Sequence, residues 1–208
     1  RPERTVQMPV TSIPSWAARE GVGAIDFCKL NVQGAELDIL AAADGPLLAS
    51  MLGVLAEVGF VESYVGRPYF SDIDVFMRRA GFTFFDLVAH HYVGRADSPV
   101  VAQHLPAALG RLGQLVSSWG QLIEGHALYL RDPIAAEREG RQPSQSALQT
   151  IKLAVVAEVF GQVEYAFELV QWHAARLRAG GNEGEAQRLD AIVAEAASRY
   201  RGDASPSA

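Results

Sequence analysis

The sequence has little of several features, and each shortage excludes a class of protein. Cys28 is the only cysteine, so the chain forms no internal disulfide and no zinc site built from several cysteines. Nowhere is there a run of about 18 apolar residues, and the N-terminal segment lacks the apolar core of a signal peptide. The sequence therefore predicts no membrane span and a cytoplasmic location.

Basic residues are fewer than acidic ones, with 18 Lys and Arg against 24 Asp and Glu and a net charge of −6. Nucleic-acid binding requires clustered basic side chains, so this balance argues against it. Hydrophobic residues make up 49% of the 208 residues, which excludes general disorder. That content is enough for the core of one domain with an appendage.

The first half of the chain alternates between two kinds of pattern. Apolar runs at residues 25–32, 51–60 and 82–90 predict strands, and the segments 35–43 and 71–79 predict helices, the second capped by its first residue, Ser71. This alternation is typical of a parallel sheet with helices on both faces. Ligands of such sheets bind at the carboxyl ends of the strands.

The second half has a different character. Residues 120–130 predict a fourth strand, which completes an α/β domain over 1–132. A linker at 133–143, a helical appendage at 144–200 and a disordered tail at 201–208 are expected to follow. The segment 97–118, with a short helix at 107–116, is ambiguous. In the appendage, Gly161 is expected to separate two helices with these inward residues: Leu148, Ile151, Val155 and Val159 on one, Val163, Ala166, Phe167 and Val170 on the other. Residues 183–200 predict a third helix.

Polar residues gather around the end of the first predicted strand. Lys29 lies within a strand expected to be buried, where lysine is rare unless it is paired. It is expected either to pair with Glu36 or Glu57, or to contact a substrate or cofactor. Glu57 is accordingly either a site residue or the partner of Lys29. Asn31 is either a site residue or a strand cap, and the next turn, Gln33-Gly34, is a backbone turn or a ligand contact.

The histidines do not suggest a metal site. His90 and His91 are adjacent in a strand and point to opposite faces, so they cannot share a ligand. His126 and His173 have no partner at ligand spacing and are interpreted as structural. No metal ion is predicted.

The segment at 29–36, Lys-Leu-Asn-Val-Gln-Gly-Ala-Glu, resembles the signature of the FkbM family of S-adenosylmethionine-dependent methyltransferases. The stretches at 57–60, 64–70 and 81–87 are similar to further elements of that family in the same order. The segment 120–132 is similar to the last strand in one branch of the family. The resemblance implies the carboxyl-terminal half of a class I, Rossmann-like methyltransferase sheet, followed by the helical appendage.

The resemblance also implies a function. Methyl transfer from S-adenosylmethionine to an oxygen or nitrogen of a small molecule or glycan is expected. Asn31, Lys29 and Glu57 are the expected catalytic residues, and Asn31, Gln33 and Gly34 are the expected cofactor contacts.

Three positions depart from the family pattern, because Asn31, Pro14 and Gly59 stand where acidic residues are usual. No strand followed by Gly-x-Gly precedes residue 25, so the strands that grip the cofactor are expected before Arg1 and this fragment is expected to be inactive. The alternative is a catalytically degenerate interaction module whose C-terminal helices bind a partner. Partner binding or self-association is expected at an exposed sheet edge or at these helices.

Overall fold

The computed structural model describes residues 7, 9–43, 45–63, 65–93, 121–143 and 145–202. The chain divides into two compact units, Arg1–Tyr129 and Leu130–Ala208. The ambiguous segment 97–118 and positions 203–208 of the predicted tail lie outside the described residues.

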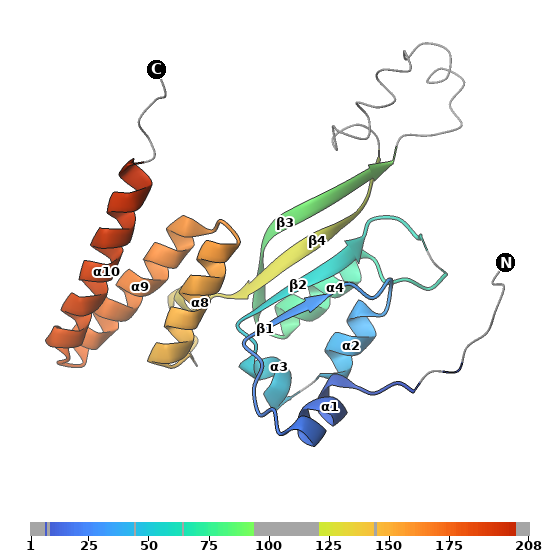
Figure 1. The fold of residues 1–208 in the computed structure, drawn as a ribbon, viewed down its shortest axis with the longest axis horizontal. Helices are drawn as coiled ribbons and strands as arrows, with labels where there is room; N and C mark the ends of the chain where they lie inside the picture. Colours follow the sequence, from blue (N-terminus) through green and yellow to red (C-terminus); the bar gives the residue numbers. More distant parts are fainter. Residues whose placement is uncertain are drawn as a thin grey trace, which may run out of the picture. The chain divides into compact units, whose positions relative to one another are not determined.

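The first unit is built on a four-stranded sheet (Figure 1). Its strands are β1 (Phe27–Leu30), β2 (Gly53–Gly59), β3 (Phe82–Val93) and β4 (Gln121–Arg131), in the spatial order β1-β2-β4-β3. β1 and β2 are parallel, as predicted. β4 runs against its neighbours, so the sheet is mixed rather than wholly parallel (Figure 1). β3 and β4 are consecutive in sequence and adjacent in the sheet, an arrangement that antiparallel pairing allows without a crossover helix.

Four helices accompany the sheet: α1 (Ile13–Glu20), α2 (Glu36–Ala42), α3 (Pro46–Ser50) and α4 (Phe70–Arg79). The predicted helices α2 and α4 are confirmed, but the expected cap of α4 is wrong. Its N-cap is Tyr69 instead of Ser71, and the Asp72 carboxylate accepts a hydrogen bond from the Tyr69 N–H at 2.8 Å. An acidic residue in the first turn favours this start because it faces the positive end of the helix dipole.

The core of the first unit lies around β2, all of whose residues are buried. Strands covered on both faces carry nearly continuous apolar sequence, and this explains the run at 51–60. Apolar side chains from the helices and the neighbouring strands complete the cluster, among them Leu30, Leu40, Met51, Ile73, Met77, Phe82 and Tyr129. Phe84 lies edge-on between the Phe70 and Tyr129 rings.

The second unit consists of helices after the end of β4. They are α7 (Pro133–Arg138), α8 (Ala147–Val159), α9 (Val163–Ala179) and α10 (Glu183–Gly202). The predicted break at Gly161 is confirmed, since its φ is +77°. α7 occupies part of the stretch that was expected to be a linker. The Asp132 carboxylate caps this helix by accepting a hydrogen bond from the Ala135 N–H, and Pro133 suits its first turn. Arg201 and Gly202, expected in the tail, continue α10.

The predicted inward face of α8 is wrong for three of its four residues, since only Ile151 is half-buried. Leu148, Val155 and Val159 are 65%, 55% and 74% exposed, whereas Leu153 is fully buried. The apolar residues of α8 are spread around the helix, so their periodicity alone did not identify its packed face. α9 is the main neighbour of α8, and the buried residues of α8 are Thr150, Leu153, Ala154 and Ala157. In the described part of the chain, no helix has the length and apolarity to cross a membrane.

Substituting Leu153 and Leu148 by alanine tests this packed face. Leu153→Ala is expected to lower the free energy of unfolding by about 2–5 kcal/mol, because it leaves a cavity in the helical unit. Leu148→Ala, the matched control on the same helix, is expected to change it by less than about 0.5 kcal/mol. Urea unfolding followed by circular dichroism measures both. Equal losses would contradict the observed face.

Candidate functional site

A group of polar side chains lies at the carboxyl ends of β1 and β2. The Phe60 N–H donates to the Ile123 carbonyl at 2.8 Å, so the start of β4 reaches the same edge of the sheet. We call this group the strand-tip cluster, and its members are Asn31, Gln33, Glu57, Arg67, Glu124 and His126. Carboxyl ends of parallel strands are where sheets of this kind bind ligands.

A buried ion pair forms the base of the strand-tip cluster. Arg67 Nη2 lies 2.7 Å from Glu57 Oε1, and the two side chains are 1% and 3% exposed. Arg67 Nη1 also donates to Glu124 Oε2 at 3.1 Å. One guanidinium therefore serves two carboxylates, which satisfies charges that would be costly to bury alone.

Two glycines leave space for this guanidinium. A Cβ added at Gly59 would lie 3.1 Å from Arg67 Nε, closer than side chains normally approach. A Cβ at Gly34 would lie 3.4 Å from Arg67 Cγ, and Gly34 has a φ of +111° that favours glycine. The glycine at position 59 thus has a packing reason.

The charges in the cluster shift the protonation of Glu57. Burial raises the pKa of the Glu57 carboxyl above its usual value, and the negative charge of Glu124 raises it further. The Arg67 guanidinium opposes both effects without cancelling them. The direction of the pKa shift therefore reflects burial first and the nearby negative charges second.

Two exposed amides lie above the ion pair. Gln33 Nε2 donates to Glu57 Oε2 at 3.0 Å and to Asn31 Oδ1 at 3.1 Å. Asn31 Nδ2 lies 3.3 Å from His126 Nε2. Gln33 adopts a φ of +59°, a strained conformation for this residue that places its amide in the cluster. These amides form the surface that a ligand would meet.

The turn that carries the amides is fixed by Glu36. This buried carboxylate accepts hydrogen bonds from the Val32 N–H at 2.8 Å and the Gly34 N–H at 2.9 Å. Its position at the start of α2 also suits the helix dipole. Glu36 therefore acts on the backbone of the turn.

The structure brings together Asn31, Gln33, Gly34 and Glu57 of the predicted site. Lys29 is exposed, and the expected pairing of Lys29 with Glu36 or Glu57 is wrong. Glu57 pairs with Arg67 instead, because the guanidinium reaches two carboxylates from the loop between β2 and α4.

Sequence reasoning missed Arg67, Glu124 and His126. Glu124 and His126 are two residues apart in a strand and so share a face, which was the available signal. Arg67 lies in an irregular loop, where spacing gives no such signal. Among the described residues, no three His, Cys, Asp or Glu side chains are grouped as metal ligands.

Residues 1–84 match the family model described as Methyltransferase FkbM domain. The match confirms the resemblance over this range, and it indicates a methyltransferase domain. It contains Asn31, Gln33, Glu57 and Arg67, whereas Glu124 and His126 lie beyond it. Searches of curated proteins and of solved structures gave no significant match.

Replacing Arg67 by methionine tests the buried ion pair. Arg67→Met is expected to lower the free energy of unfolding by about 3–5 kcal/mol, because Glu57 remains buried without its cation. Arg78→Met, which removes a partly exposed pair with Asp74, serves as the control and is expected to cost less than about 1 kcal/mol. Equal effects in urea unfolding would contradict the assigned role of Arg67.

The raised pKa of Glu57 predicts a pH dependence of stability. Between 4.5, the ordinary value, and its raised pKa, the folded chain holds a proton on Glu57 that the unfolded chain releases. The contribution of Glu57 to the free energy of unfolding is therefore lost as the pH rises through that window. The stability of the wild type relative to Glu57→Gln is expected to fall from pH 4.5 towards neutrality.

Urea unfolding at several pH values measures this difference. Glu62→Gln, at an exposed carboxyl in the same unit, is the control and should give a flatter profile. A wild type that gains stability relative to Glu57→Gln as the pH rises would refute the assigned shift.

Proposed function

We propose that the chain is part of an S-adenosylmethionine-dependent methyltransferase of FkbM type, which transfers a methyl group to an oxygen or nitrogen of a small molecule or glycan. One observation carries this proposal. Four members of the strand-tip cluster fall inside the segment that matches the methyltransferase domain, and they lie at the carboxyl ends of two parallel strands.

The charge of the strand-tip cluster suits this cofactor. S-adenosylmethionine, when bound, supplies a methyl group already activated on a sulfonium cation. Two carboxylates against one guanidinium leave an excess negative charge that favours a cationic ligand. The exposed amides of Asn31 and Gln33 and the backbone of Gly34 supply neutral hydrogen-bonding groups beside it.

The residues of this site have separate roles in the proposal. Asn31 orients the methyl acceptor, and Gln33 holds Asn31 in place through its hydrogen bond. Glu57 acts below them by fixing the Gln33 amide. Lys29 is two residues before Asn31 and exposed on β1, so its ammonium contacts the substrate from the solvent side. Methyl transfer depends mainly on proximity and alignment, which this arrangement supplies.

The edge of the sheet supports a further part of the proposal. β1 is an outer strand of the described sheet and pairs only with β2 there. We infer that another strand pairs with β1 in the active protein and brings a Gly-rich turn to the cofactor. The 208-residue chain alone would then be inactive.

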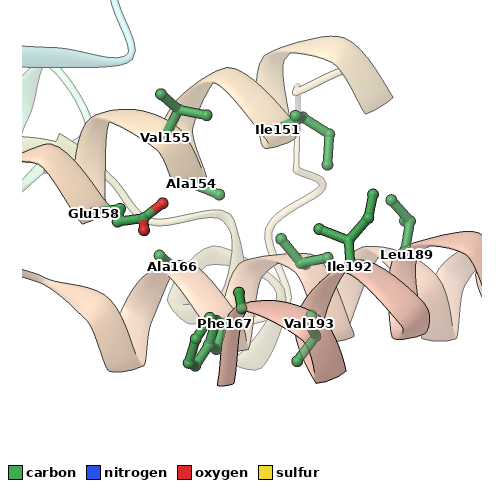
Figure 2. A pocket seen from close by; sticks show the side chains of 11 residues that line it. Ile151, Ala154, Val155, Glu158, Ala166, Phe167, Leu189, Ile192 and Val193 are labelled. Carbon is green, nitrogen blue, oxygen red and sulfur yellow. The ribbon is translucent and has the colours of Figure 1, made fainter. Parts of the chain in front are cut away.

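The alternative function, a partner-binding module, is supported by a pocket in the second unit. Helices α8, α9 and α10 line a half-open pocket of about 130 Å³ whose side chains are almost entirely apolar, among them Ile151, Val155, Phe167 and Ile192 (Figure 2). Glu158, the one charged residue in the lining, accepts a hydrogen bond from the Tyr200 hydroxyl. A partner would insert apolar side chains here.

Calorimetric titration of S-adenosylmethionine distinguishes the two functions. The protein as produced from its gene is expected to bind the cofactor, and Asn31→Ala is expected to weaken binding about tenfold through the loss of a polar contact. Arg138→Ala, an exposed change in the second unit, is the control and should leave the affinity unchanged. Absence of binding by the wild type would reject the enzyme in favour of the module.

A further inference from the structure

We propose that His126 is the proton acceptor of the strand-tip cluster, and that Gln33 and Asn31 are positioning residues that fix its tautomer. This inference rests on the proposed function for its role in methyl transfer. The tautomer itself follows from contacts within the chain and is tested without any ligand.

The direction of each hydrogen bond is set from the buried ion pair outward. Glu57 pairs with Arg67, so its carboxylate is ionised and can only accept. Gln33 must therefore present its NH₂ group to Glu57, and the same group donates to Asn31 Oδ1. The Asn31 amide is thereby oriented with its NH₂ group towards His126 Nε2.

This orientation decides which nitrogen of His126 carries the hydrogen. A donor at 3.3 Å requires Nε2 to be the acceptor, so the neutral imidazole holds its hydrogen on Nδ1. The Nε2 lone pair then accepts from the amide of Asn31, a residue that is exposed to solvent.

The charges of the strand-tip cluster do not balance without His126. Glu57 and Glu124 exceed Arg67 by one negative charge, and an imidazolium would bring the strand-tip cluster to neutrality. Glu124 lies two residues from His126 on the same face of β4. On β3, the other neighbour of β4, the titratable side chains that the structure describes are those of Asp86 and His90, both exposed.

The other members of the cluster are less suited to this role. Asn31 has an amide in place of a basic group, and Glu57 and Glu124 are both engaged by Arg67. An imidazole exchanges its proton near neutral pH, which suits a general base.

The proton transfer proceeds as follows. The hydroxyl or amine of the methyl acceptor donates its hydrogen to His126 Nε2 in place of the Asn31 amide. As the acceptor atom bonds to the methyl carbon, the carbon–sulfur bond breaks and its electron pair stays on sulfur. The acceptor proton passes to Nε2, and the imidazolium later releases it to water.

Nitrogen-15 NMR of the histidine rings in the whole chain tests the inference. The His126 signals, assigned by their loss in His126→Gln, are expected to show the Nδ1–H tautomer. Asn31→Asp, which replaces the donor by a carboxylate of the same size, is expected to convert the ring to Nε2–H and to raise its proton affinity about tenfold. A wild-type ring in the Nε2–H form would overturn the proposal.

A second variant tests the charge argument. Glu124→Gln is expected to lower the proton affinity of His126 by about threefold to tenfold, because it removes the nearby negative charge. Asp38→Asn, an exposed change of equal charge on α2, is the control. Equal titrations in the two variants would also overturn the proposal. Failure of the proposed function would appear separately, as a wild type that binds no S-adenosylmethionine.

Discussion

The contact on which the candidate site depends is the ion pair between Arg67 and Glu57. It is almost fully excluded from water, and the hydrogen bonds of Gln33 link it to the exposed amide of Asn31. Because the carboxylate is committed to the guanidinium on one oxygen, its other oxygen orients Gln33. The buried charges therefore fix the orientation of the exposed amide groups, although a ligand need not contact those charges.

Such an arrangement combines rigidity with access. Glu57 and Arg67 are buried, whereas Asn31 and Gln33 are exposed to solvent. The turn that carries these amides is held by Glu36 through two backbone hydrogen bonds. Pre-organised polar groups on a fixed turn are what alignment-driven chemistry requires, since little ordering remains to be done when a ligand arrives.

Much of the fold could be predicted from the sequence, because strands, helices and their breaks have local signals. The apolar run in β2 and the glycine between α8 and α9 are examples. The packed face of α8 could not be predicted, because its apolar residues are spread around the helix. Which of them are buried depends on the packing of neighbouring elements such as α9.

The same distinction applies to the candidate site. Asn31 and Gln33 stand out at a strand end, where polar residues are informative. The partner of Glu57 was not predictable, because the nearby Lys29 and the more distant Arg67 carry the same charge, and only the folded loop decides between them.

The close approach of Gly59 to Arg67 has a consequence for substitution at position 59. The guanidinium occupies the space in which a side chain at position 59 would begin. A carboxylate at that position would require the arginine side chain to move or to be replaced. The side chain that position 59 can carry is thus limited by where the Arg67 guanidinium lies.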